Sequence, residues 1–243
     1  MAEDEIRKHA KAAYKAFKDP EHSWQHKVKD ILLEVAIIVF AVSISIWFHN
    51  LSDKRADERL EQAFLTGLKV DLKNDLDNMK QSKAFYRDVL NGMTYFSKIG
   101  SGGILNMDSL NKYNTIFFSS TTLQSHTSRY EALKGSGKLS IIEDQELLNQ
   151  IISYNESTLS HINLLNTLYM QYIEKLATYI EQNGQLDKAG RITNAQDLLD
   201  KSEMRFLLSF GRGSISGNVI PAHDDGLQKC AALLKAIDKN LDN

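Results

Sequence analysis

Few side chains in this chain could ligate a metal ion or activate a nucleophile, and none forms a catalytic pattern. His223, Asp224 and Asp225 stand together, but a metal site needs three or four converging ligands, and no second His or Cys follows at ligand spacing. We therefore expect Asp224 or Asp225 to cap the last helix. His126 and His161 fall on different predicted helices, without a Ser/His/Asp or Cys/His arrangement suited to nucleophilic catalysis.

A glycine-rich stretch near the C-terminus has the composition of a phosphate-binding loop but not its setting. Gly211, Gly213 and Gly217 lie close to Arg212. A dinucleotide-binding loop requires a strand before it and a helix after it, and neither is indicated here. We expect a flexible connector. The sequence thus predicts no catalytic residue, no cofactor and no metal, and a protein that is not an enzyme.

The strongest pattern in the sequence is an apolar segment long enough to cross a bilayer. Residues 31–48 contain one glutamate and two serines as their only polar side chains, and a helix needs about 17 to 25 residues to cross the hydrocarbon core. We predict a transmembrane helix over residues 31–49. A core helix of a globular domain would show a polar stripe, and a signal peptide would have a shorter apolar run.

Aromatic and basic residues flank this helix, as is typical at the headgroup layer. We expect Trp24, Lys27, Lys29 and Trp47 to anchor it at the membrane interfaces. Five lysines lie in the twenty residues before the span, against three basic residues (Lys and Arg) in the twenty from His49 onward. The bias favours a cytoplasmic N-terminus. The protein would then be a single-pass protein of the bacterial inner membrane, in contact with its lipids, with its main domain in the periplasm.

Residues 1–30 form a predicted cytoplasmic, basic amphipathic segment. Ile6, Ala10 and Phe17 fall on one helical face, with basic residues around the other. Such a helix can lie on an anionic inner leaflet, or it can be a solvated tail. Both interpretations stay open.

One face of the predicted transmembrane helix is suited to contact a second helix. Spacings of four and three place on it Glu34, Ile38, Ala41, Ser45 and His49. Ala41 and Ser45 form a small-xxx-small pair, which lets another helix approach closely. Glu34 has two interpretations, because a carboxylate in the apolar zone either pairs within a helix contact or extends to the headgroups near the preceding lysines.

Residues 50–243 have the pattern of a helical domain. Apolar residues recur at spacings of three, four and seven, and glycine-containing turns separate the periodic runs. We predict helices over residues 50–98, 109–118 with Asp108 as its cap, from after residue 122 to 134, from Asp144 to 183, 195–210 and 225–241. Cys230 falls on the apolar face of the last one and should be buried. The predicted fold class is all-α, with one N-terminal transmembrane helix followed by an antiparallel helical bundle.

Composition excludes two broad classes of protein. The net charge is −2 and the sequence pI is about 6.4, so the chain has no global basic field for nucleic acid. The single cysteine cannot form an internal disulfide, and a domain of this size does not need one. We therefore expect neither a nucleic-acid partner nor a disulfide scaffold.

Two segments resemble a bacterial family of single-span proteins whose domain has no assigned function. The matching positions are Glu34, Asn50, Asp53, Lys54 and Arg55 at the span, and Leu133, Lys134, Ser136, Gly137, Leu139 and residues 142–147 further on. Gly135 replaces the usual serine, and Leu51 stands where the family has a tryptophan. The resemblance covers residues 31–243. It implies a membrane anchor and a helical extracytoplasmic domain, and it implies no activity, cofactor or catalytic residue.

Two functions of different classes follow from these patterns. In the first, the protein is a non-enzymatic structural or accessory protein, which associates with itself as a homo-oligomer or with a membrane protein complex through its span and its bundle. In the second, it is a membrane-tethered sensor or ligand-binding module with a site between the bundle helices. The N-terminal tail contains no recognisable output domain, which favours the first.

Overall fold

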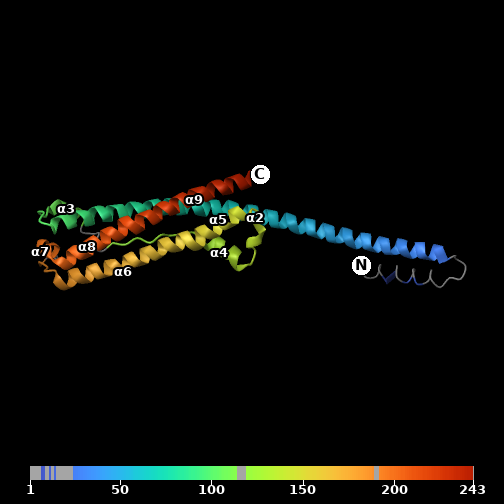
Figure 1. Ribbon diagram of the computed structural model, residues 1–243, viewed down its shortest axis with the longest axis horizontal. Helices are drawn as coiled ribbons and strands as arrows, with labels where there is room; N and C mark the ends of the chain where they lie inside the picture. Colours follow the sequence, from blue (N-terminus) through green and yellow to red (C-terminus); the bar gives the residue numbers. More distant parts are fainter. Residues whose placement is uncertain are drawn as a thin grey trace. The chain divides into compact units, whose positions relative to one another are not determined.

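The computed structural model describes residues 7, 8, 11, 14, 24–113, 119–188 and 192–242. The chain divides into two units, Met1–Leu60 and Glu61–Asn243 (Figure 1), and each is described by itself. The compact second unit thus begins at Glu61, about ten residues after the domain boundary expected from the sequence. Most of the predicted amphipathic segment over residues 1–30 lies outside the described residues.

The described residues are almost entirely helical. The helices are α2 (Trp24–Ile99), α3 (Met107–Tyr113), α4 (Ser128–Gly135), α5 (Gln145–Ile152), α6 (Leu159–Asn183), α7 (Ala195–Asp200), α8 (Ser202–Ser214) and α9 (Ile220–Leu241). Short turns link them: η2 (Leu139–Ile141), and the π-helical turns η3 (Ser153–Thr158) and η4 (Ile215–Val219). Within the described part, the only extended pairing is an isolated bridge between Leu186 and Ile192. The predicted all-α class is confirmed.

In the first unit, α2 contains a stretch that is long and apolar enough to cross a membrane. None of its most apolar window is buried within the structure. Large side chains such as Leu33, Phe40 and Trp47 are well exposed, at 64%, 67% and 59%. Helix α2 also contains the long helix expected over residues 50–98, and it ends one residue later, at Ile99.

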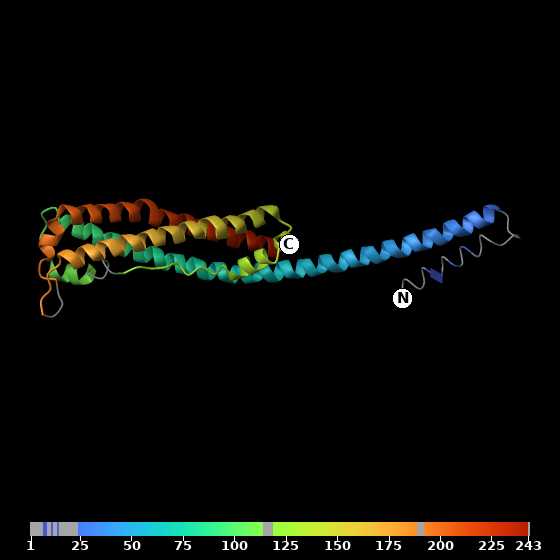
Figure 2. The same ribbon diagram turned by 90° about the horizontal axis from the view of Figure 1, so that it is seen from below.

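The second unit packs long helices along one another. Residues 61–99 of α2, helix α6, and helices α8 and α9 lie side by side in both views (Figures 1 and 2). The shorter helices α3 and α7 lie at one end of this unit and α4 at the other. An extended segment over residues 119–127 lies along α2, where Asn78 Nδ2 donates a hydrogen bond of 2.7 Å to the Gln124 carbonyl. A helix was predicted to begin soon after residue 122, but α4 begins only at Ser128.

Two apolar clusters form the interior of the second unit. The first core joins α2, α4, α5, α6 and α9 through residues such as Leu68, Met79, Ile151, Ile162 and Leu233. The second core joins α2, α6, α7 and α8 through residues such as Met93, Phe96, Leu176, Leu199 and Leu208. These residues follow the three-and-four spacing that the sequence shows, because that spacing places them on one side of each helix. Cys230 is fully buried, as predicted.

Two predicted helix starts have different outcomes. Asp144 caps α5 as expected, because its Oδ1 accepts hydrogen bonds from the backbone N–H groups of Glu146 and Leu147 at 2.9 and 3.0 Å. Asp108 does not cap α3, since it lies inside the first turn. Asn106 takes that place, and its Oδ1 accepts from the Ser109 N–H at 3.1 Å.

The prediction of a flexible, glycine-rich connector over residues 211–217 is wrong, because this stretch is helical from α8 through η4 into α9. Helix α9 therefore begins at Ile220, and neither Asp224 nor Asp225 caps it. Gly211 explains the error. A Cβ atom there would lie 2.4 Å from Tyr172 Oη and 2.9 Å from Met93 Sδ, so this glycine permits close helix packing.

Replacing single glycines tests this interpretation. Gly211→Ala should lower the free energy of unfolding by about 1–3 kcal/mol, because the new methyl group must displace the Tyr172 ring. Gly213→Ala is the matched control, since a Cβ there meets nothing within 4 Å. It should raise stability by about 0.5–1 kcal/mol through helix propensity. Urea unfolding followed by circular dichroism measures both. Equal effects of the two variants would contradict the packing role of Gly211.

Candidate functional site

The predicted contact face of the span lies on α2, in the first unit. Glu34 and Ile38 are half-buried, and Ala41, Ser45 and His49 are exposed. The Ser45 hydroxyl donates to the Ala41 carbonyl at 2.9 Å, which satisfies this polar group inside its own helix. The surface formed by the two small residues Ala41 and Ser45 therefore offers no free hydroxyl donor to a second helix.

The predicted interface anchors are only partly described. Lys29 and Trp47 are exposed on α2, and the Trp47 ring packs edge-on against Phe48 with centroids 5.0 Å apart. The side chains of Trp24 and Lys27 lie outside the described part of the structure. His49 Nε2 lies 3.4 Å from Asp53 Oδ2, one helical turn further on.

A polar layer separates the two apolar cores of the second unit. It consists of Ser82 and Tyr86 on α2, Asn166 on α6 and His223 on α9, all of them buried. The Tyr86 hydroxyl donates to Asn166 Oδ1 at 2.7 Å, and Ser82 Oγ lies 3.0 Å from His223 Nε2. Because buried polar groups need partners, these pairs favour one register of the three helices over a shifted one.

The hydrogen bonds of His223 define its tautomer. Its Nδ1 lies 2.8 Å from the Val219 carbonyl, which can only accept, so Nδ1 carries the proton. The unprotonated Nε2 then accepts the Ser82 hydroxyl proton. Burial lowers the pKa of His223 below its usual value, against the opposing effects of the Val219 carbonyl and Asp224. The imidazole is therefore neutral at physiological pH.

The Ser82 and His223 pair resembles the nucleophile and base of a hydrolase, but its setting does not support catalysis. Ser82 is 3% exposed and His223 is 0% exposed, so a substrate cannot reach the hydroxyl without opening the core. A backbone carbonyl, and not a carboxylate, holds His223 Nδ1. The pair acts as a structural hydrogen bond between α2 and α9.

A second polar cluster lies within the first core, around Asp75. One carboxylate oxygen accepts from the His126 backbone N–H and lies 2.8 Å from its Nδ1, and the other accepts from the Tyr154 hydroxyl at 3.2 Å. These bonds hold the extended segment and η3 against α2. The Cys230 thiol donates to the Leu72 carbonyl at 3.2 Å. Burial raises the pKa of this thiol to about 11, so it stays protonated and unreactive.

The described residues contain no group of three or more His, Cys, Asp or Glu side chains placed to hold a metal ion. Asp224 forms an ion pair with Lys83, and Asp225 lies 2.7 Å from Lys229 Nζ. Both carboxylates are thus engaged with lysines. His161 is exposed on α6.

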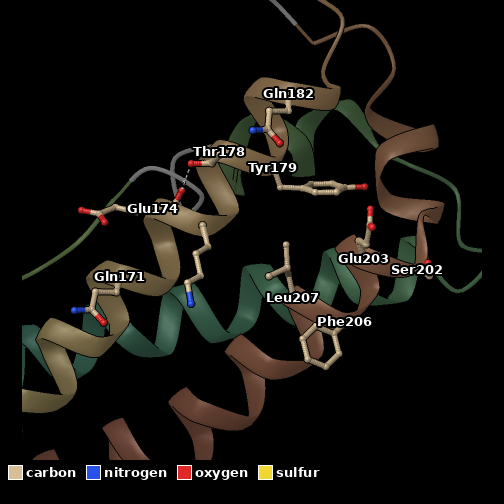
Figure 3. Close-up of a pocket in the computed structure, with 10 residues that line it drawn as sticks. Gln171, Glu174, Thr178, Tyr179, Gln182, Ser202, Glu203, Phe206 and Leu207 are labelled. Carbon is tan, nitrogen blue, oxygen red and sulfur yellow. Dashed lines mark hydrogen bonds between the residues drawn. The ribbon is translucent and has the colours of Figure 1, made fainter.

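A hollow of about 830 Å³ lies between α6 and α8 (Figure 3). Its lining combines charged, polar and aromatic residues: Gln171, Glu174, Lys175, Thr178, Tyr179, Gln182, Ser202, Glu203, Phe206 and Leu207. The Tyr179 ring extends from α6 toward α8 (Figure 3). Burial, and then Glu203, raise the pKa of Tyr179. The lining offers rings and amides for binding.

The polar layer was not predicted from the sequence, although the sequence contains a signal for it. Ser82 lies three residues after Met79 and four before Tyr86, which places it at a core position of an apolar stripe. Asn166 lies four residues after Ile162 and three before Tyr169, which also places it at a core position. A polar residue at such a position predicts a buried hydrogen bond, but only the structure shows which side chain is its partner.

Comparisons of this protein with protein-family models, with curated proteins and with solved structures found no match. The resemblance to the family of single-span proteins therefore stays a prediction.

The buried neutral state of His223 predicts a pH dependence of stability. In the unfolded chain its pKa returns to about 6.5, so below that pH the unfolded state binds a proton that the folded state refuses. The free energy of unfolding should fall as the pH drops from 7 to 5, by up to about 1.4 kcal/mol per pH unit from this residue. Urea unfolding at each pH measures the slope.

His223→Gln should flatten this dependence, and His161→Gln, which changes an exposed histidine, should leave the wild-type slope. If His223→Gln and wild type lose stability equally between pH 7 and 5, the buried imidazole is not the titrating group.

Proposed function

We propose that this protein is a membrane-anchored, non-enzymatic structural or accessory protein, which associates with itself or with a membrane protein complex. Residues 31–49 form its transmembrane helix, and residues 50–243 form an antiparallel helical bundle. The proposed location is the bacterial inner membrane, with the N-terminus in the cytoplasm and the bundle in the periplasm. The excess of lysines before the span supports this orientation.

One observation carries the proposal: the apolar stretch of α2 is not buried within the structure. Exposing this stretch to water is unfavourable, because burial of one large apolar side chain contributes about 1.5–3 kcal/mol of favourable free energy. Summed over the whole stretch, the free-energy cost of exposure to water exceeds the usual free energy of unfolding of a domain, about 5–15 kcal/mol. A bilayer supplies the missing apolar surrounding.

The contact face of the span supports association beyond simple anchoring. Without a hydrophobic driving force between helices in lipid, small residues favour helix contacts because they let backbones approach closely. Ala41 and Ser45 supply such a surface, and the Ser45 hydroxyl is already bonded within α2. Glu34, on the same face, is suited either to a polar contact with the partner helix or to the headgroup layer.

The buried polar groups support a non-enzymatic role. The Ser82 hydroxyl and the His223 imidazole are bonded to each other inside the core, and the Cys230 thiol is bonded to a backbone carbonyl. These groups are used to hold helices together.

A second candidate function is a membrane-tethered sensor or ligand-binding module. The hollow between α6 and α8 favours it, because its volume is in the range of small-molecule sites and its lining includes Tyr179 and Phe206. Phe206 and Phe210 are also strongly exposed, at 68% and 57%, and their rings stack at 6.3 Å. The hollow and these exposed rings would bind either a ligand or another protein.

Bulky substitutions on the span test the association. Replacing Ala41 and Ser45 together by Leu keeps the helix apolar but adds bulk that prevents close approach. The yield of crosslinked dimer or of co-purified partner should fall at least fivefold, with unchanged membrane localisation. Crosslinking in native membranes, followed by extraction in mild detergent, measures this yield.

The matched control is Ala36→Leu with Ser43→Leu, which places the same two substitutions on the opposite face of the helix. This control should associate as wild type does. Glu34→Gln reports on the carboxylate, since it weakens an interhelical polar pair but not a headgroup contact. Association that is equal in the Ala41/Ser45 variant and in its control would contradict the contact face.

A further inference from the structure

A basic cavity lies between the end of α2 and helix α8, within the second unit. Its volume is about 390 Å³, and its lining consists only of serines and cations: Ser97, Lys98, Ser101, Arg205, Ser209 and Arg212. None of these six residues carries negative charge. The cavity is separate from the hollow of Figure 3, with which it shares no lining residue.

Two donors in this cavity are buried without a partner. Ser97 Oγ and Arg212 Nε are both inaccessible to solvent and make no hydrogen bond to any described residue. A buried donor left unpaired costs about 1–3 kcal/mol, and more when it is charged. A bound group or an ordered water that supplies an acceptor would remove this cost.

The cations of the cavity also form no ion pair with any residue that the structure describes. Among the described residues, no carboxylate forms an ion pair with Lys98, Arg205 or Arg212. Lys98 lies in the last turn of α2, where a cation is favourable to the helix dipole. Arg205 lies in the first turn of α8, where the dipole favours an acid instead. Helix stability therefore does not explain Arg205.

The backbone at the end of α2 allows the Arg205 side chain to pack beside the cavity. A Cβ atom on Gly100 would lie 3.3 Å from Arg205 Cγ and 2.3 Å from the Leu199 carbonyl oxygen. The glycine thus lets the Arg205 stem pack against the end of α2. The Ser101 hydroxyl donates to the Ser97 carbonyl at 2.9 Å, so this loop residue is held in place. The Ser97 hydroxyl itself makes no hydrogen bond to a described residue.

We propose that this cavity is a binding site for a phosphate monoester group. Two guanidinium groups and one ammonium can only donate, and the serine hydroxyls can donate as well, which suits an acceptor with several oxygens and a charge near −2. A small side-chain shift brings Ser97 Oγ and Arg212 Nε into reach of the bound group, and the more exposed Arg205 and Lys98 bind from the rim. The volume exceeds that of a bare phosphate and leaves room for a small organic part. A soluble metabolite and a lipid headgroup both present this chemistry.

Isothermal titration calorimetry of the full-length protein in detergent micelles tests the site. The probes are inorganic phosphate, phenyl phosphate and dioctanoyl phosphatidic acid, at constant ionic strength. We expect saturable binding of at least one monoester probe. Binding should tighten from pH 5 to pH 7, because the second pKa of the monoester is about 6 and the dianion pairs better with the cations. Tighter binding of phenyl phosphate supports a soluble ligand, and tighter binding of phosphatidic acid supports a lipid headgroup.

Variants assign the binding to this cavity. Arg212→Gln and Ser97→Ala should each weaken it at least tenfold, and Arg205→Gln should do so as well from an exposed position where folding is not at risk. Arg87→Gln is the matched control, an exposed arginine of α2 outside the cavity, and should bind as wild type does. Circular dichroism checks that each variant is folded.

The proposal is overturned if no probe gives saturable binding, or if Arg212→Gln and Arg205→Gln bind as tightly as Arg87→Gln. This outcome is distinguishable from failure of the proposed association, because the cavity variants leave the span unchanged and the span variants leave the cavity unchanged.

Discussion

The main constraint on this protein is an apolar stretch of α2 whose side chains are not covered by any part of the described structure. The apolar stretch of α2 begins at Ile31, and none of its most apolar window is buried. A polypeptide helix satisfies its own backbone hydrogen bonds, so such a stretch can enter hydrocarbon at little cost. The proposed location, orientation and partners all depend on the insertion of this stretch into a bilayer. The bundle could bind a ligand in any compartment, but only the span restricts which surfaces the protein can meet.

Polar residues give the helical domain its specificity, while apolar residues give most of its stability. The two cores contain residues of similar size and shape, and helices packed by such residues alone tolerate alternative registers. The polar layer opposes this, since shifting α2 against α9 would separate Ser82 from His223 and leave the Ser82 hydroxyl and His223 Nε2 buried without partners. Asp75 has the same effect on the segment that carries His126. The same kind of cost applies to the unpaired donors of the serine and arginine cavity, Ser97 Oγ and Arg212 Nε.

Helical periodicity allowed the fold class, the apolar stretch and the burial of Cys230 to be predicted from sequence, because each depends on local patterns. The start of α5 was also predictable, since Asp144 stands directly before an apolar run. Errors arose where tertiary packing overrides local preference. Gly211 looks like a helix breaker but allows Tyr172 to pack closely. The cavity was not predicted, because Ser97 and Arg212 are far apart in sequence and the glycine-rich stretch around Arg212 was interpreted as a connector.

Cysteine accessibility tests the central claim, that residues 31–49 cross the bilayer, most directly. Cys230 is the only cysteine, so Cys230→Ala provides a background for Ser23→Cys, Ser43→Cys or Ser52→Cys. A membrane-impermeant maleimide should label Ser52→Cys on spheroplasts, Ser23→Cys only after permeabilisation, and Ser43→Cys in neither case. Labelling of Ser43→Cys as fast as Ser52→Cys would contradict a membrane span at these residues.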